Sequence, residues 1–147
     1  IVTFTDALQS KALVPALKFH FADDLPVFAT SQTARSKDLG ELANFRITEL
    51  PLLTKPNATA RSMTATFDLK DNPLIEFFAL GLDAYRLATW THWLNENQAA
   101  LGDAQTLTLV LASGTLALGR QSSIKRRLDM ATIDRRGNVR PAVGNER

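Results

Sequence analysis

The chain has 147 residues, a net charge of +2, and 45% hydrophobic and 22% charged residues, which is the composition of one ordinary globular domain. It contains no cysteine, which excludes disulfides, thiolate metal sites and cysteine lipidation within these residues. No apolar run approaches the ~20 residues that a membrane-spanning helix needs.

The charge is unevenly distributed. Residues 120–147 hold eight Lys or Arg and three Asp or Glu, a net charge of +5, which leaves −3 on the residues before them. Such a basic stretch fits either an anionic partner or a solvated strand and tail. Nucleic-acid binding is disfavoured, because single-strand binders place aromatic side chains among their cations and no aromatic residue follows Trp93.

Residues 1–50 alternate between strand and helix patterns. The runs IVTF (1–4), VFATS (27–31) and NFRITELP (44–51) predict three short strands, the last of which ends at Pro51. A helix pattern separates the first two runs, and the polar segment 32–42 is typical of a loop or a broken turn of helix. This rhythm predicts an α/β layer with parallel strands.

The helix between the first two strands begins after Thr5 or Asp6, either of which is a good N-cap. Pro15 predicts a kink or a restart, because it has no N–H to donate. Apolar residues recur at helical spacing, which supports the helix: Leu8, Ala12, Pro15 or Ala16, and Phe19.

A long helix dominates the middle of the chain. Residues 52–73 form a connection with a weak helical pattern, and Asn72 and Pro73 then cap and begin a helix that runs to about Asn97, with Gly102 as a stop.

The long helix is apolar on most sides, which predicts that it is largely buried. Gly81 is expected at its closest approach to neighbouring backbone, since glycine otherwise weakens a helix. Asp83 and Arg86 are expected to form an (i, i+3) surface pair on a narrow polar stripe. The expected buried face comprises Leu74, Phe77, Phe78, Gly81, Tyr85 and Ala88, extended by Leu80, Ala84 and Leu87.

The last third of the chain has β patterns. Residues 106–111 and 113–118 predict two strands with a turn at Ser113–Gly114, and residues 124–133 predict one longer strand paired antiparallel with residues 115–118. Residues 134–138 predict a final turn.

Catalytic and metal-binding motifs are absent from the sequence. His20 and His92 have no neighbouring ligand residues, and there is no glycine-rich phosphate loop or nucleophile elbow. Ser122 to Lys125 matches S-x-x-K, but it enters a strand, where residues three apart point to opposite faces. The residues therefore favour a binding module without metal, cofactor or catalysis over an enzyme.

The best candidates for ligand contacts are Thr30, Ser31 and Gln32. They follow the carboxyl end of a predicted strand, which is where open α/β sheets place their ligand crevice. An ordinary polar loop is the alternative interpretation.

Three blocks, in order, resemble a known family. They are LVPALKFHFADDLPVFATSQTA, ELANFRITELPLL, and the pair FFALGLDAYRLA and LASGTLALGRQSSIKRRLDMATIDRRGNVRP. Together they are similar to the C-terminal domain of the outer-membrane lipoprotein activators of penicillin-binding protein 1A, the LpoA (LppC) family. The hairpin differs from the family's usual Gly-x-Thr-Gly, because it reads Ala112-Ser113-Gly114-Thr115.

The resemblance implies that residues 1–147 are the C-terminal part of a type I periplasmic-binding-protein-like fold, a parallel sheet with flanking helices and a C-terminal hairpin. Residues 1–50 would be a β-α-β segment of one lobe, 51–102 a connection and long helices, and 103–147 the hairpin and basic tail. The N-terminal portion would be missing, so we expect open sheet edges that favour a swapped or edge-paired homo-oligomer.

The resemblance also implies a function. Members of this family are non-enzymatic activators of a class A penicillin-binding protein, held at the periplasmic face of the outer membrane by a lipid anchor that would lie outside this chain. The alternative is a solute-binding receptor lobe for amino acids or a similar small metabolite.

Overall fold

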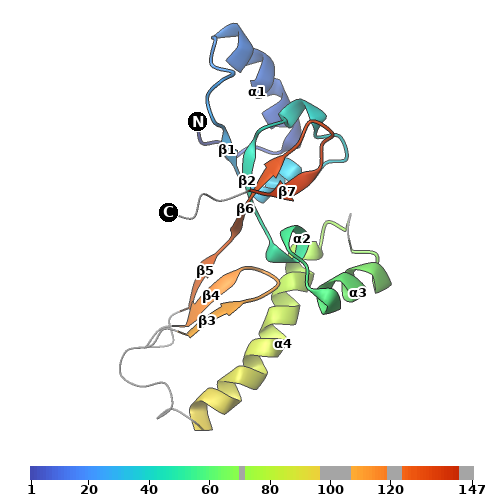
Figure 1. Cartoon of the computed structure of the whole chain (residues 1–147), viewed down its shortest axis with the longest axis vertical. Helices are drawn as coiled ribbons and strands as arrows, with labels where there is room; N and C mark the ends of the chain where they lie inside the picture. Colours follow the sequence, from blue (N-terminus) through green and yellow to red (C-terminus); the bar gives the residue numbers. More distant parts are fainter. Residues whose placement is uncertain (70–71, 97–106, 119–123, 143–147) are drawn as a thin grey trace. The chain divides into compact units, whose positions relative to one another are not determined.

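The computed structural model describes residues 1–69, 72–96, 107–118 and 124–142 (Figure 1). The chain forms two compact units. Unit 1 comprises residues 1–49 and 129–147, and unit 2 comprises residues 50–128. Unit 1 is therefore assembled from both ends of the chain, with unit 2 inserted between them.

Unit 1 contains a four-stranded sheet in the order β1-β2-β6-β7. Its strands are β1 (Phe28–Ala29), β2 (Arg46–Glu49), β6 (Asp129–Ile133) and β7 (Val139–Pro141). The β1–β2 pair is parallel, and Val2 adds a parallel bridge to Phe28, whereas the β2–β6 and β6–β7 pairs are antiparallel. The α/β class is confirmed, with parallel pairing confined to the N-terminal part of this sheet.

Helix α1 (Ala7–Phe19) begins at a reciprocal cap. The Gln9 backbone N–H donates to Asp6 Oδ1 at 2.8 Å, and the Asp6 backbone N–H donates to Gln9 Oε1 at 3.3 Å. Each bond satisfies a donor that the first helical turn would otherwise leave free. The helix continues through Pro15 without a restart. Two 3₁₀ turns, η1 (Ser31–Ala34) and η2 (Gly40–Leu42), lie between β1 and β2.

The apolar residues that recur at helical spacing do not form the buried face of α1. Leu8 and Phe19 are each 78% exposed, while Ala7 and Ser10 are buried and Val14 packs against the core. The helix carries apolar residues on both sides, so periodicity alone could not select the side that packs on the sheet.

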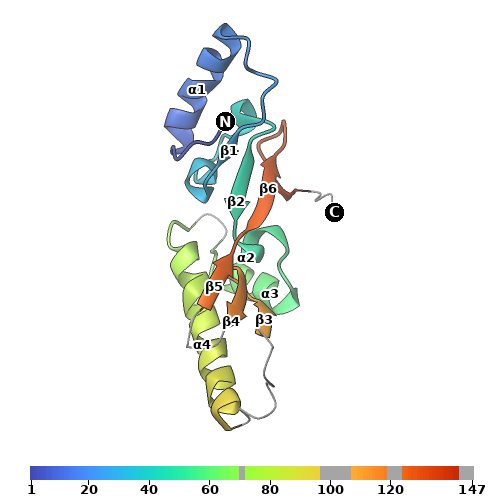
Figure 2. The same ribbon diagram turned by 90° about the vertical axis from the view of Figure 1, so that its left-hand side faces the viewer.

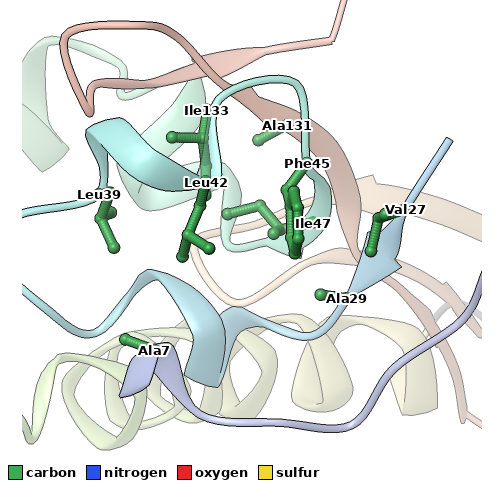
Figure 3. Close-up of a cluster of buried hydrophobic side chains, with 9 residues drawn as sticks. All are labelled: Ala7, Val27, Ala29, Leu39, Leu42, Phe45, Ile47, Ala131 and Ile133. Carbon is green, nitrogen blue, oxygen red and sulfur yellow. The ribbon is translucent and has the colours of Figure 1, made fainter. Parts of the chain in front are cut away.

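The core of unit 1 lies between α1, the 3₁₀ turns and the sheet (Figure 3). Each fully buried Leu or Ile contributes about 1.5–3 kcal/mol relative to an exposed position. The cluster comprises Ala7, Val27, Ala29, Leu39, Leu42, Phe45, Ile47, Ala131 and Ile133. It joins residues from both ends of the chain, so this core forms only when β6 has added to β2.

A tight turn, predicted at residues 134–138, connects β6 to β7. Asp134 Oδ1 accepts the backbone N–H groups of Asn138 at 2.9 Å and Arg136 at 2.8 Å. Hydrogen bonds from Asn138, then the Arg136 N–H and the charge of Arg140, hold the pKa of Asp134 below its usual range against a smaller opposing effect of desolvation. Gly137 has φ +77°, and an added Cβ would lie 3.1 Å from the Gly40 nitrogen. Glycine fits this turn for both reasons.

Unit 2 begins with three helices, α2 (Pro51–Thr54), α3 (Ala58–Thr66) and α4 (Ile75–Glu96). Asn57 caps α3 by accepting the Ala60 N–H at 2.8 Å. Asn72, the predicted cap, accepts the Leu74 N–H at 2.8 Å just before α4. The described part of α4 extends to Glu96, and the predicted end near Asn97 and the predicted stop at Gly102 lie outside the described residues.

The sheet of unit 2 is an antiparallel meander of β3 (Leu107–Val110), β4 (Thr115–Leu118) and β5 (Ile124–Arg127), and α4 runs alongside it (Figure 2). The predicted β3–β4 turn closes through the Leu111 N–H, which donates to the Gly114 carbonyl at 3.0 Å. An added Cβ on Gly114 would lie 2.8 Å from the Arg127 carbonyl oxygen, so only glycine allows β5 to approach this turn.

The single strand predicted at residues 124–133 is divided. Residues 124–127 pair with β4 as expected, but residues 129–133 pair with β2 and β7 in the other sheet. Leu128 separates the two strands and packs against the core of unit 2. A strand pattern records the extended backbone and not its partners, so the division was not visible in the sequence.

Helix α4 is continuous, but the predicted burial is wrong. Its inner side carries Ile75, Ala79 and Asp83, which are buried, whereas Phe77 is 70% and Tyr85 75% exposed. Gly81 is exposed, and a Cβ there would meet no atom within 4 Å, so it does not mark a close backbone contact. The core of unit 2 comprises Leu50, Leu52, Ala60, Leu69, Ile75, Ala79 and Ala112.

Asp83 connects α4 to the β3–β4 turn. Its side chain is only 2% exposed, and its two oxygens accept the backbone N–H groups of Ala112 at 2.8 Å and Ser113 at 2.6 Å. The predicted surface pair with Arg86 is therefore wrong. Hydrogen bonds to a buried charged acceptor are among the stronger ones in proteins, so Asp83 fixes the turn on the helix.

Replacing Asp83 with Asn is expected to lower the free energy of unfolding by about 1.5–3 kcal/mol, because the acceptor loses its charge and the new amide faces a backbone donor. Denaturation by urea, followed by tryptophan fluorescence, measures this change. Both tryptophans, Trp90 and Trp93, lie in α4 and report on unit 2.

The matched control is Asp68→Asn. Asp68 is exposed and has a positive φ of 48°, a conformation that Asn tolerates. The control should change stability by less than about 0.5 kcal/mol. Equal stability of the two variants would contradict the role given to Asp83.

Candidate interaction surfaces

The predicted ligand contacts lie at the carboxyl end of β1. Thr30 stands before η1, and Ser31 and Gln32 are the first two residues of that turn. Thr30 and Ser31 are half-buried and Gln32 is exposed. The Thr30 carbonyl accepts the Thr33 N–H at 3.1 Å, so these residues form the turn by which the chain leaves the sheet. Their role in ligand contact stays a prediction.

Buried and half-buried hydroxyl groups beside this turn form a cluster that the sequence analysis did not single out. The Thr5 hydroxyl lies 2.8 Å from that of Thr3 and 2.7 Å from that of Ser10, and the Ser10 hydroxyl lies 3.2 Å from that of Thr33. Thr33 also donates to the Thr5 carbonyl at 2.7 Å. The cluster joins the N-terminal segment, α1 and η1.

A buried carboxylate lies at the same end of the sheet, where β1 and β2 have their carboxyl ends. Glu49, the last residue of β2, is 1% exposed and accepts two hydrogen bonds from Arg35, at 2.8 and 2.9 Å. Its register partner across the β2–β6 ladder is Asp129. Directly opposed like charges destabilise a sheet, so the Arg35 guanidinium offsets the repulsion at this position.

These polar groups satisfy one another. In the part of the chain that the structure describes, no buried side-chain nitrogen or oxygen lacks a hydrogen-bond partner. Built ligand sites usually present a few convergent polar groups to the ligand. The hydroxyl cluster and the Arg35–Glu49 pair instead hold together the end of the sheet.

A hollow of about 350 Å³ lies at the opposite, amino ends of β1 and β2. Val14 and Leu17 of α1, together with Val27 and Phe45, form its apolar part, and Lys18, Asp23 and Glu41 line it as charged residues. None of the predicted contacts, Thr30, Ser31 and Gln32, lines it.

Both long helices expose apolar surface. The α1 outer stripe consists of Leu8, Ala12, Pro15, Ala16 and Phe19, and the α4 outer stripe consists of Leu74, Phe77, Leu80, Gly81, Ala84, Tyr85 and Ala88. All of these residues are exposed, and neither stripe contains a charge. Contiguous exposed apolar surface of this kind is typical of a protein-binding face.

The described residues form neither a metal-binding cluster nor a helix that could span a membrane. Within them, no three His, Cys, Asp or Glu side chains come together as a metal site would require. Nor does any helix there have the length and apolar character needed to cross a membrane. Of the S-x-x-K match, Lys125 lies on β5, and Ser122 lies outside the described residues.

No family model and no curated protein matches the chain significantly. Solved structures do match it. The C-domain of LpoA (YraM) from Haemophilus influenzae, a regulator of PBP1A, superposes with a TM-score of 0.69 at 13% identity, over 97% of this chain and 44% of that one. Full-length LpoA from the same organism matches with a TM-score of 0.68 at 12% identity, over 96% of this chain and 26% of that one.

A further match is a branched-chain amino acid ABC transporter structure from Chromobacterium violaceum, with a TM-score of 0.56 at 26% identity, over 86% of this chain and 39% of that one. The chain thus spans less than half the length of the structures it matches. It has the fold of part of the LpoA C-domain, and the predicted resemblance is confirmed at the level of fold.

Replacing Arg35 with Met is expected to destabilise the protein by about 3 kcal/mol or more, because Glu49 would stay buried without its guanidinium partner. Arg35→Lys should fall between this variant and the native protein, since an ammonium cannot make the paired contact. Denaturation followed by circular dichroism measures both.

Lys37→Met serves as the control for Arg35→Met. It removes one exposed positive charge from the same loop and should leave the unfolding midpoint close to that of the native protein. If Arg35→Met unfolds together with this control, the Arg35–Glu49 pair does not support the sheet.

Proposed function

We propose that this chain is a protein-binding module, without catalytic activity of its own, that regulates a class A penicillin-binding protein and thereby peptidoglycan synthesis. The observation that carries the proposal is the match of 97% of the chain to the fold of the LpoA C-domain, whose structure is described as that of a PBP1A regulator. At 13% identity this likeness supports the fold alone, so the partner is part of the proposal.

The surface chemistry supports contact with a protein. The buried polar groups at the carboxyl ends of β1 and β2 form hydrogen bonds with one another. The α1 and α4 outer stripes instead present large apolar side chains to solvent. Tyrosine is enriched among the residues that dominate binding energy at protein interfaces. The α4 outer stripe exposes Tyr85 together with Phe77, so it is the preferred contact face.

Regulation requires only differential binding. A partner that binds the active state of the synthase more tightly than the inactive state shifts the population toward activity, without taking part in the reaction. The protein that carries this chain would act at the periplasmic face of the outer membrane, held by a lipid anchor outside these residues.

The direct test combines the full protein that carries this chain with a purified class A penicillin-binding protein from the same organism. We expect binding and stimulation of transpeptidation. The double substitution Phe77→Ala and Tyr85→Ala should weaken binding about tenfold or more, since truncating central aromatic residues costs about 2 kcal/mol or more. Biolayer interferometry and a cross-linking assay measure the two effects.

The control is the double substitution Leu8→Ala and Phe19→Ala on the α1 outer stripe, which removes comparable exposed apolar area. Circular dichroism checks that both variants fold. Equal loss of binding by the two variants would refute the choice of the α4 outer stripe, and no binding by the native protein would refute the proposed function.

A second candidate is a solute-binding receptor lobe. It is favoured by the match to the branched-chain amino acid transporter structure, which has the higher identity, 26%, but the lower TM-score, 0.56. The hydrogen-bonded pairing of the hydroxyl cluster and of Glu49 argues against it, because a free amino acid needs available donors and acceptors.

Thermal unfolding of the full protein with leucine, isoleucine or valine distinguishes the two candidates. A receptor saturated at 100 times its dissociation constant gains about 2.7 kcal/mol of stability. We expect no shift of the melting temperature with any of the three. A shift that saturates with concentration would favour the receptor.

A further inference from the structure

In the part of unit 2 that the structure describes, strand β5 lies at an edge of the sheet. It pairs with β4 on one side, in the register Thr115↔Arg127 to Leu118↔Ile124, and within the described residues no strand pairs with its other side. All four of its residues are exposed. Ladder bonds in an antiparallel pair alternate along the strand, so part of the β5 backbone faces away from β4 and can accept another strand.

Three consecutive cations occupy this edge. Lys125 and Arg127 lie on one face of the sheet and Arg126 on the other, because side chains alternate along a strand. None of the three takes part in an ion pair with another described residue. Any strand that adds to β5 therefore meets positive charge on both faces.

The β3–β4 turn packs against β5. Gly114 allows the β3–β4 turn to approach within contact of β5, where the side-chain carbons of Arg126 lie over it. The same turn is held on α4 by the two hydrogen bonds to Asp83. Contacts that hold a strand in place before binding reduce the freedom lost on binding, which favours association.

Charge decides which strand fits. A second copy of β5 would oppose cation to cation, and like charges directly across a ladder are destabilising. A strand with Glu or Asp at alternate positions would place its carboxylates beside Lys125 and Arg127. Nucleic acid fits less well, since the open backbone edge offers it nothing and no aromatic residue follows Trp93.

We propose that β5 is a docking strand that binds an extended, acidic segment of a partner protein by adding it to the unit 2 sheet. Main-chain hydrogen bonds would supply the affinity and the three cations the specificity, which is the usual division in strand addition. The inference rests on the proposed function only in that it assigns this segment to a protein that the chain contacts.

The test uses the full protein and three synthetic, fluorescently labelled peptides. The first alternates Glu and Val, the second alternates Lys and Val, and the third is the Glu–Val peptide with alternate backbone nitrogens methylated. Methylation keeps the charge but removes donors to the ladder. Fluorescence anisotropy should show binding of the first peptide only, weakened by high salt.

Charge reversal tests the location. The double substitution Lys125→Glu and Arg127→Glu should weaken binding of the Glu–Val peptide about tenfold or more and create binding of the Lys–Val peptide. The control, Lys18→Glu with Arg61→Glu, makes the same change of net charge at exposed positions on α1 and α3 and should change neither affinity by more than about twofold.

Three results would overturn the inference: no binding of the Glu–Val peptide by the native protein, equal binding of its methylated form, or equal weakening by the control pair. The first and third would remove β5 as the site, and the second would leave a charged patch without strand addition. A protein that binds the synthase but fails these tests contradicts this inference alone, because the peptides are assayed without the synthase.

Discussion

The pairing of β2 with β6 is the constraint on which the rest of the structure depends. Unit 2 leaves the sheet of unit 1 after Glu49 and returns at Asp129, and these two residues lie directly opposite each other in the ladder. This one pair of residues therefore brings together the two ends of the inserted unit. Joining the ends of a segment costs conformational entropy, and that cost rises only slowly with the length of the segment. The cost is met by the core that β6 completes through Ala131 and Ile133, and Arg35 offsets the repulsion between the two carboxylates at the closing point.

The second buried acid, Asp83, solves the corresponding problem in unit 2. A hydrogen-bonded carboxylate holds the β3–β4 turn against the inner side of α4, so the outer side of the helix is not needed to fix the turn. The apolar residues there are left exposed and uncharged. The two buried acids therefore serve the fold. Among the described residues, the surfaces that remain for binding are the exposed apolar stripes and strand β5, whose cations form no ion pair with another described residue.

Local features were predictable from the sequence, because the residues that determine them are neighbours. They include the Asp6 cap, the Asn72 cap and the turn at Ser113–Gly114. The buried face of each long helix was not predictable from the sequence. Helices α1 and α4 are apolar on both sides, and only the element that packs against the helix determines which side is buried. The division of the last long strand at Leu128 depends on residues far away in the chain. The sequence did contain one signal for Asp83, namely an acidic residue within an apolar helix. Its role as a hydrogen-bond acceptor could not be inferred without knowing that the β3–β4 turn packs beside it. Nothing in the structure tests the roles of Thr30, Ser31 and Gln32, so these remain predictions.

A fold shared at 13% identity preserves the arrangement of elements but few of the side chains, so specificity must come from surfaces that this sequence itself builds. Unit 2 offers two surfaces with different physics. The α4 outer stripe would gain affinity by removing apolar area from water, and it would accept any partner of suitable shape. Strand β5 would discriminate between partner segments by their charge and by the register in which they pair, because a strand ladder permits only particular registers. An apolar face alone would be promiscuous, and a charged edge alone would be weak and sensitive to salt. The proposed regulator of a synthase would need both properties, and unit 2 carries both an exposed apolar stripe and a cationic edge strand.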